Sequence, residues 1–412
     1  MKQGWKESKL SCFVKDFLVP QRDKPKIFSG DIPWCRIEDF NGIYLSDSKT
    51  NQYVSQKTIS EMGLKVYPVN TVIVSCSADL GKCAIIKRPL VTNQTFIGLV
   101  PSDNLDSKFL YYYMSSIAKK LNEMASGATI KYLSKKKFQD LVVCFPPLPE
   151  QQRIVSILDE AFAAIAKAKA NAEQNLKNAA ALFESYLQGM FENKGDGWEE
   201  KSLEELTDEK CTLSYGIVQP GEEFENGLPV IRPTDLTSRY IKVEGLKRID
   251  PKLADGYKRT KLIGDELLLC VRGTTGVVSI ATPELKDANV TRGIVPIRFS
   301  PKILNQEFGY YLLISNYVQK QIRANTYGAA LMQINIGDLR KIQTPFPALA
   351  EQQTIVRQLD ALRAETQKLE VVYQKKIDDL EELKKSILQK AFAGELRGGE
   401  LVEPKTKKAV VV

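Results

Sequence analysis

The apolar positions of the chain fall into two patterns, one typical of long helices and one typical of short strands. From Pro149 to Phe191, apolar or small residues recur at spacings of three and four, and no glycine interrupts the run before Gly189. The same pattern recurs over 350–396, where Gly394 is a stop signal. Such spacing over several heptads predicts coiled-coil helices. With about 40 residues at 1.5 Å each, each helix would be on the order of 60 Å long.

The two predicted helices differ in the bulk of their apolar faces. The first is rich in alanine through its middle, whereas the second places Leu369, Tyr373 and Leu380 there. In an antiparallel pair Ala172 falls opposite Tyr373, so small residues meet large ones, which suits close packing. The sequence therefore predicts an antiparallel pair within one chain. The residues expected at the helix or subunit interface are Ile154, Leu158, Ala172, Leu182, Ile355, Leu359, Tyr373 and Leu380.

The segment before each helix has the strand pattern. β-Branched runs such as 69–74, 84–86 and 97–100 alternate with Gly, Pro, Asn and Asp, which predicts a twisted sheet. Segments 108–122 and 306–323 carry helical spacing with clustered tyrosines, for which core packing is favoured over base stacking. Each globular part is therefore mixed α and β.

The two halves of the chain are an internal repeat, because the same landmarks occur in the same order. Trp5 recurs as Trp198, Arg36 as Arg232, and the triplet 150–152 (Glu-Gln-Gln) as 351–353. The offset grows from 193 at the tryptophans to 201 at the triplets and then stays constant to the helix ends. Length differences therefore accumulate in the globular parts, as expected of surface loops, and not in the helices.

These patterns predict an α+β fold with two similar mixed α/β domains, separated by two long antiparallel coiled-coil helices in a pseudo-twofold repeat. The expected boundaries are 1–148 for the first domain, 149–193 for the first helix, 194–349 for the second domain and 350–396 for the second helix, with 397–412 as a flexible tail. If its partner were DNA, such a protein would touch two short sites on one face, separated by about one helical turn.

Composition limits the classes of function that the chain can have. A net charge of +8 over 412 residues favours a polyanionic partner. The absence of histidine excludes Ser-His-Asp and Cys-His nucleophile systems and removes the commonest metal ligand. The seven cysteines form no C-x-x-C pair, so we expect them to be reduced and mostly buried. No apolar run is long enough to span a bilayer, and we expect a cytoplasmic protein without membrane contact.

The motifs that open and close the predicted helices resemble the conserved regions of type I restriction-modification specificity subunits. They are Pro-Pro-Leu-Pro-Glu-Gln-Gln-Arg-Ile at 146–154, its echo at 347–353, and Ser-Ile-Leu-Gln-Lys-Ala-Phe-Ala-Gly-Glu-Leu at 386–396. The resemblance covers essentially the whole chain.

This resemblance implies that two target-recognition domains read the halves of an asymmetric bipartite DNA target through the major groove. The helices would fix the spacing and dock two methyltransferase subunits. Those partners would N6-methylate adenine using S-adenosylmethionine, and restriction/translocase subunits would use ATP and Mg. The resemblance implies no catalytic residue, metal or cofactor in this chain.

Candidate DNA contacts lie in polar loops that follow apolar strands, where glycines allow close approach to phosphate and Arg272 is suited to reading guanine. Lysines at 131–137, in a loop that begins at Gly127, would either neutralise phosphates or form a solvated charged surface. The counterpart loop at 328–337 has no lysine. Arg36 and Arg232 are better explained as internal ion pairs with Asp39 and Asp235. The predicted DNA-binding residues are Ser75, Ser77, Lys82, Asn93, Gln94, Thr95, Lys131, Tyr132, Lys135, Arg272, Thr274, Thr275, Asn289 and Arg292.

Two enzymatic functions have little support in the sequence. A nuclease is suggested only by Asp265 with Glu284 and Lys286, a loose pattern that often arises by chance. An adenine methyltransferase is suggested only by Phe-Pro-Pro-Leu at 145–148, which lacks the amide and the aromatic residue of the catalytic tetrapeptide. The main alternative from a different class is a coiled-coil scaffold or adaptor with duplicated protein-binding heads.

Overall fold

The computed structural model describes residues 4–20, 24–77, 79–126, 131–328 and 332–396. The chain divides into two compact units, one formed by 1–172 with 375–412 and the other by 173–374. Each unit therefore holds one globular domain and a segment of each long helix. The predicted tail at 397–412 and residues 127–130 of the lysine loop lie outside the described residues.

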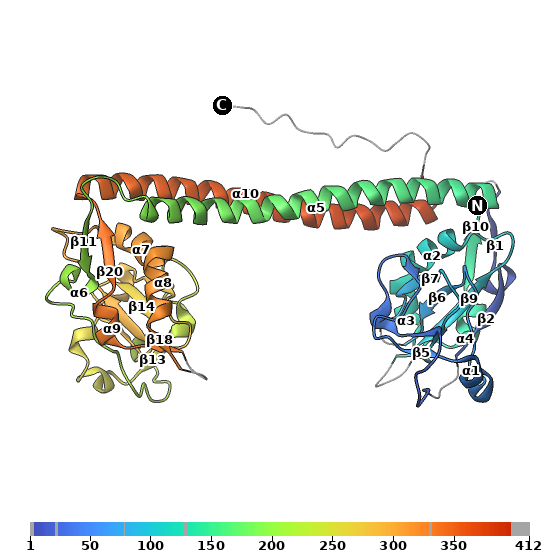
Figure 1. Cartoon of the computed structure of the whole chain (residues 1–412), viewed down its shortest axis with the longest axis horizontal. Helices are drawn as coiled ribbons and strands as arrows, with labels where there is room; N and C mark the ends of the chain where they lie inside the picture. The colour runs from blue at the N-terminus through green and yellow to red at the C-terminus, as the bar shows by residue number, and fades with distance from the viewer. Residues whose placement is uncertain (1–3, 21–23, 78, 127–130, 329–331, 397–412) are drawn as a thin grey trace, which may run out of the picture. The chain divides into compact units, whose positions relative to one another are not determined.

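The domain of the first unit is built on a five-stranded sheet with strand order β2-β9-β6-β7-β4. A smaller sheet has the order β5-β3-β8, and β1 pairs with β10, far away in the sequence, before the first long helix (Figure 1). The elements are β1 (Lys6–Lys9), β2 (Val14–Leu18), β3 (Ile32–Cys35), β4 (Tyr44–Leu45), β5 (Tyr53–Val54), α1 (Gln56–Met62), β6 (Val72–Ser75), β7 (Cys83–Ile86), β8 (Val91–Thr92), β9 (Phe96–Pro101), α2 (Ser107–Ser116), α3 (Ala118–Met124), α4 (Lys135–Gln139) and β10 (Val142–Phe145).

The domain of the second unit repeats this plan. Its sheets have the orders β15-β14-β17 and β13-β12-β16, with β11 paired to β20 and β18 to β19. The elements are β11 (Glu199–Ser202), α6 (Leu203–Leu206), β12 (Leu228–Ile231), β13 (Lys247–Ile249), β14 (Leu267–Cys270), β15 (Val278–Ile280), β16 (Asn289–Val290), β17 (Ile294–Ile297), α7 (Gln306–Ile314), α8 (Asn316–Ala324), β18 (Thr326–Tyr327), β19 (Gln333–Ile334), α9 (Ile336–Arg340) and β20 (Gln343–Phe346).

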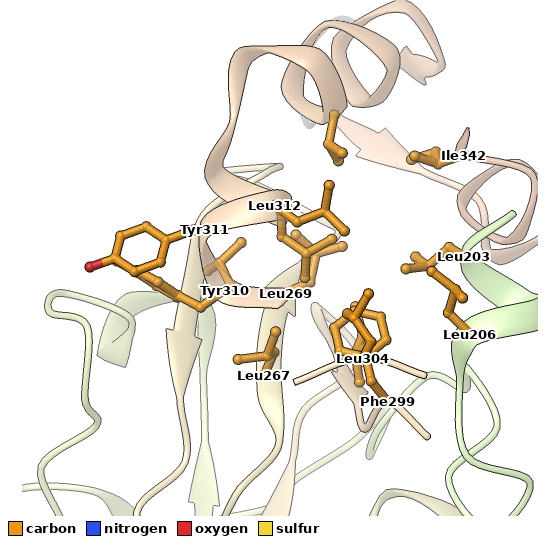
Figure 2. Packing of buried hydrophobic residues seen from close by; sticks show 14 of the residues in the cluster. Leu203, Leu206, Leu267, Leu269, Phe299, Leu304, Tyr310, Tyr311, Leu312 and Ile342 are labelled. Atoms are coloured by element: carbon orange, nitrogen blue, oxygen red, sulfur yellow. The ribbon is translucent and has the colours of Figure 1, made fainter. Parts of the chain in front are cut away.

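The core of the second domain forms between a helix and a strand. Figure 2 shows Leu267 and Leu269 of β14 beneath Tyr310 and Leu312 of α7, and all four side chains are buried. The tyrosines of the first domain behave alike, since Tyr112 and Tyr113 of α2 are buried. Core packing is thus confirmed for these tyrosines.

The two long helices are α5 (Leu148–Glu192) and α10 (Leu349–Phe392), within a residue or two of their predicted starts. In the first unit, the start of α5 (Ile154) shares a core with the end of α10 (Ala391). In the second unit, the end of α5 (Leu187) shares a core with the start of α10 (Leu359). The helix segments in each unit are therefore antiparallel, as predicted. Ala172 and Tyr373 belong to different units, so their predicted contact stays a prediction.

The predicted interface residues separate by burial. Ile154, Leu158, Ala172, Ile355 and Leu359 are buried, whereas Tyr373 and Leu380 are half-buried.

Leu182 is a correction to the predicted helix seam, because 50% of it is exposed. The buried positions near the end of α5 are Ala179, Leu187 and Phe191, with Phe183 packed beside them. Their spacing of four, instead of the mixed three and four of a coiled coil, turns the apolar stripe toward the domain. Leu182 lies beside that stripe and faces away from the core.

The middle residue of each Glu-Gln-Gln triplet fastens its helix to its domain. Gln151 is 1% exposed, accepts a hydrogen bond from the backbone N–H of Asp106 at 2.9 Å and donates to two backbone carbonyls, those of Asn104 and Pro146. Gln352 is 0% exposed and makes the same three bonds, to Asn305, Ile303 and Pro347. The motif is thus a structural anchor, which ties a helix start to the loop before α2 or α7.

A second tether recurs about two turns further along each helix. Asp159 of α5 accepts a hydrogen bond from the Tyr112 hydroxyl at 2.6 Å, and Asp360 of α10 accepts one from the Tyr311 hydroxyl at 2.5 Å. Burial and the neighbouring carboxylate raise the pKa of both phenols, so they stay protonated donors.

All seven cysteines are free, and five of them are buried. Within the described ranges, no helix is both long and apolar enough to cross a membrane.

Candidate nucleic-acid interface

A polar pocket of the first domain lies where two parallel strands end. β3 pairs with β8, with Trp34 opposite Val91 and Cys35 opposite Thr92. The chain leaves these strands at Arg36 and at Asn93, so both side chains reach the same edge of the sheet. The pocket has a volume of about 260 Å³ and is lined by Lys24, Trp34, Arg36, Asn93, Gln94 and Thr95.

The second domain has a pocket at the same place in its fold. β12 pairs in parallel with β16, with Ile231 opposite Val290, and the chain leaves at Arg232 and Thr291. This pocket has a volume of about 610 Å³ and is lined by Ile217, Val218, Arg232, Pro233, Thr234, Arg272, Gly273, Thr291, Arg292 and Gly293. We call the two sites pocket 1 and pocket 2, after their domains.

Backbone hydrogen bonds fix which positions correspond. The N–H of Cys76 donates to the carbonyl of Thr95 at 2.8 Å, and the N–H of Val271 donates to that of Gly293 at 2.8 Å. Gln94 therefore corresponds to Arg292, since each stands one residue before the accepting carbonyl. By the same register Ser77 corresponds to Arg272. Four corresponding positions, 36/232, 93/291, 94/292 and 95/293, line both pockets.

The arginine that both pockets share is held internally. The guanidinium of Arg232 donates to Asp235 from Nε at 3.1 Å and from Nη2 at 2.9 Å, which raises the pKa of Arg232, as the predicted ion pair requires. In the first domain only the backbone N–H of Arg36 bonds Asp39, and its guanidinium pairs with Glu38 at 3.0 Å. The predicted partner of Arg36 is therefore corrected, because Asp39 is 3% exposed and also bonds the backbone of Lys49.

The other two arginines of pocket 2 have no acidic partner among the described residues. Arg292 is exposed, and Arg272 is half-buried with its Nε atom inaccessible to solvent and without a hydrogen-bond partner. No acidic side chain lines the pocket. A site of this kind favours a ligand rich in hydrogen-bond acceptors.

The loop between β6 and β7 is a tight turn with one exposed cation. Gly81 has φ +86°, and a Cβ there would lie 2.6 Å from that of Ala118, so only glycine fits. Lys82 is exposed, with Nζ 5.9 Å from the ring centroid of Phe40, and lines a shallow hollow of about 520 Å³. Ser77 is half-buried and accepts a hydrogen bond through its carbonyl oxygen from Ser75 Oγ at 2.7 Å.

Two predicted contacts are corrected because their side chains are buried. Ser75 is 0% exposed, and its hydroxyl bonds within the turn. Asn289 is 2% exposed; its amide oxygen accepts from Thr260 at 2.7 Å and its amide nitrogen donates to the carbonyl of Tyr257 at 3.1 Å. Both are structural residues and cannot reach DNA.

The remaining predicted contacts are at the surface of their domains. Lys131, Tyr132 and Lys135 are exposed, and Lys135 begins α4. Thr274 is exposed beside Cys270, and Thr275 donates to the carbonyl of Met332 at 3.1 Å.

Sequence reasoning missed that Arg272 and Arg292 line one pocket, together with Thr234 and Thr291. One sequence signal could have located the pockets. It is the spacing of Arg232 and Asp235, which recurs at Arg36 and Asp39 and marks the end of the paired parallel strand in each half. Within the described ranges, no cluster of three or more His, Cys, Asp or Glu is arranged to hold a metal ion.

The duplicated domain, its corresponding polar pockets and the long helices define a two-domain recognition protein. The sequence profile of the type I restriction modification DNA specificity domain matches residues 3–177 and again 195–381. The chain therefore belongs to the family of type I restriction-modification specificity subunits, and its role is in DNA specificity.

Type I specificity subunits from two organisms are similar to this chain along most of their length. The specificity subunit of the type I restriction enzyme EcoBI from Escherichia coli is 28% identical over 89% of this chain and 80% of its own. The MjaIX specificity subunit from Methanocaldococcus jannaschii is 26% identical over 93% of this chain and 91% of its own.

Solved structures share the fold. A chain from a study of assembly and conformational transition of the type I system superposes with a TM-score of 0.74 at 19% identity, covering 96% of this chain and 99% of the other. The HsdS subunit from Thermoanaerobacter tengcongensis gives a TM-score of 0.62 at 19% identity, covering 95% and 97%.

Proposed function

We propose that each domain reads one half of an asymmetric, bipartite DNA target and that α5 and α10 fix the spacing of the two halves. The observation that carries this proposal is the pair of pockets at corresponding positions in duplicated domains. Each pocket lies where a pair of parallel strands ends, and each domain is anchored to a long helix by the buried glutamine of its Glu-Gln-Gln triplet. A reader that must place two contact surfaces at a set distance needs such anchoring.

The helices are also the proposed docking site for two methyltransferase subunits. In the second unit, α5 exposes Leu182 (50%) and Tyr186 (43%), and α10 exposes Leu369 (41%) and Val372 (58%). These apolar side chains have no role in the domain core, and exposed apolar surface of this kind is typical of protein interfaces. Leu182 is therefore assigned to a subunit interface instead of the helix seam.

The chemistry belongs to the partners in this proposal. The methyltransferase subunits would bind S-adenosylmethionine and methylate adenine at N6, and restriction/translocase subunits would use ATP and Mg. This chain would contribute double-stranded DNA recognition and assembly.

The test is duplex binding by the chain assembled with its methyltransferase partners, measured across a salt series. A reader predicts that log affinity falls linearly with log salt and that one set of duplexes binds preferentially. Methylated adenines mapped in DNA treated with the assembled complex should define a two-part motif. Binding with no sequence preference at any salt concentration would refute the proposal, and the absence of duplex binding would favour a protein-binding scaffold.

A further inference from the structure

Pockets 1 and 2 occupy the same place in the fold but differ in hydrogen-bonding chemistry. Where pocket 2 has Arg292, pocket 1 has Gln94, and where the second domain has Arg272, the first has Ser77. The arginine that both pockets keep forms an ion pair in each domain, Arg36 with Glu38 and Arg232 with Asp235, although the Nε of Arg36, like that of Arg272, has no hydrogen-bond partner. Among the positions that differ, Gln94 and Arg292 have exposed side chains that form no ion pair or side-chain hydrogen bond with a described residue.

That pattern favours base reading over phosphate binding. The phosphate backbone presents the same chemistry to both domains, so a phosphate contact does not require different residues in corresponding pockets. A base contact must change when the two half-sites differ in sequence. Positions 94 and 292 thus behave as expected of base-reading residues.

The charged side chains that line pocket 2 are all donors. The guanidiniums of Arg272 and Arg292 present N–H groups without a lining carboxylate, Thr234 adds a hydroxyl group, and the hydroxyl of Thr291 donates to the carbonyl of Ile231 at 3.3 Å. The buried, unpartnered Nε of Arg272 leaves a donor that only an incoming acceptor or water can satisfy. The major-groove edge of guanine presents two acceptors, O6 and N7, which match a planar guanidinium.

Pocket 1 presents both a hydrogen-bond donor and an acceptor. Gln94 is exposed, and its amide makes no hydrogen bond with a described residue, whereas the Asn93 oxygen is taken up by the Thr95 hydroxyl at 2.6 Å. A free primary amide has one donor and one acceptor side by side, which match N7 and N6 of adenine.

Resting on the proposed function, we infer that pocket 2 reads a guanine through Arg292 and Arg272, and that pocket 1 reads an adenine through Gln94. The two half-sites then differ at the base pair that faces these pockets.

The experiment exchanges the two reading residues. Arg292→Gln, Gln94→Arg and the wild-type chain are each assembled with the methyltransferase partners and given S-adenosylmethionine and duplexes of randomised sequence. The methylated products are sequenced. Arg259→Gln and Gln56→Arg are matched controls, because both residues are exposed, outside the pockets, and undergo the same change of charge.

The wild-type motif should contain a guanine in one half-site, and Arg292→Gln should weaken its preference over other bases by about 10-fold or more while the other half-site is unchanged. Gln94→Arg should move the opposite half-site from adenine toward guanine. Arg292→Lys distinguishes a contact with guanine from a contact with phosphate. Lysine keeps the positive charge that binds phosphate but lacks the planar guanidinium that can bond O6 and N7 of guanine together. The preference for guanine should therefore fall while overall methylation stays near the wild-type level.

Three results would overturn the inference. They are a motif without guanine in the half-site that domain 2 reads, an equal loss of methylation on all sequences in Arg292→Gln, and unchanged preference in both exchange variants. In each case a two-part wild-type motif still supports the proposed function, whereas its absence refutes the function itself. Gel filtration and circular dichroism of each variant assembly identify a folding defect, and Arg292→Lys then supplies the decisive comparison.

Discussion

The amide oxygen of Gln352, at the start of α10, accepts a hydrogen bond from the backbone N–H of Asn305 at 2.8 Å, and the side chain of Gln352 is shut away from solvent in the second unit. Since the same glutamine also donates to two carbonyls, Gln352→Ala removes the partner of three backbone groups, and the bond to the carbonyl of Pro347 among them is fully buried. We expect a loss of about 2–4 kcal/mol in the free energy of unfolding.

The control for this prediction is the next residue. Gln353 is exposed, and Gln353→Ala should change the free energy of unfolding by less than about 0.5 kcal/mol. Denaturant titration measures both, and hydrogen exchange should show faster exchange at the Asn305 amide only in Gln352→Ala. Equal stability of the two variants would contradict the anchoring role.

Glu266 is the most deeply buried carboxylate of the second domain. It is 0% exposed, receives backbone N–H bonds from Ile263 and Gly264, and forms an ion pair with Arg298. Glu266→Ala leaves the guanidinium of Arg298 with only Asp265, 3.5 Å away, so we expect a loss of about 3–5 kcal/mol. Asp265→Ala removes a carboxylate that is 59% exposed and should cost far less. A similar cost for both would show that burial of Glu266 is not decisive.

The last aromatic residue of each long helix should stabilise a different unit. Phe191 of α5 packs against Phe308 at a centroid distance of 5.6 Å, and Phe392 of α10 packs against Phe109 at 5.3 Å. Phe191→Ala should cost about 3–5 kcal/mol, with faster hydrogen exchange confined to 173–374, because Phe191 is fully buried. Phe392→Ala should instead accelerate exchange in 1–172. The opposite assignment in either variant would contradict the pairing of the helix ends.

An ion cluster predicts a pH dependence in the second unit. Hydrogen bonds from Lys194 and then Tyr317 lower the pKa of Glu200, whose ordinary value is 4.5. A carboxylate with a lowered pKa adds stability above its ordinary value, and that stability is lost as pH falls through the lowered pKa. Wild type should therefore be more stable than Glu200→Gln at pH 7, with the difference shrinking below pH 4.5. Glu199→Gln, at a neighbouring exposed carboxylate, is the control, and a constant difference across pH would contradict the prediction.

The exposed lysines of the first domain predict a change in affinity without a change in specificity. Lys131 and Lys135 are exposed and outside pocket 1. If they contact phosphates, Lys131→Ala with Lys135→Ala should reduce the slope of log affinity against log salt by about 2 and weaken all duplexes alike. Loss of one base preference in this double variant would instead make one of them a reading residue. The exposed Lys49 and Lys57, replaced together, are the control.

Much of the fold was predictable, because periodicity and repeated landmarks are properties of the sequence. The ends of α5 and α10 followed from apolar spacing, and the predicted antiparallel order agrees with the shared cores of the helix segments within each unit. The predicted helix seam is wrong at Leu182, because a helix that packs on a domain buries a different face from a helix that packs only on another helix. Spacing alone does not show which neighbour a helix has.

The pockets were predictable only in part. Polar loops after apolar strands were identified, but Ser75 and Asn289 turned out to be buried, since a polar residue at a strand end serves the turn as readily as the surface. The convergence of Arg272 and Arg292 depends on the hydrogen bond from Val271 to Gly293, which is a property of sheet register.

The unit composed of 1–172 and 375–412 also constrains the order of events during synthesis. Its core includes Phe109 and, more than two hundred residues later, Ala391 and Phe392. At roughly 5–20 residues per second, the ribosome needs about 10–45 s to deliver that closing segment after residue 172 has been made. During this interval the start of α5 has no helical partner from its own chain, while the unit at 173–374 is being completed. The domain that is translated first is therefore the last to be finished.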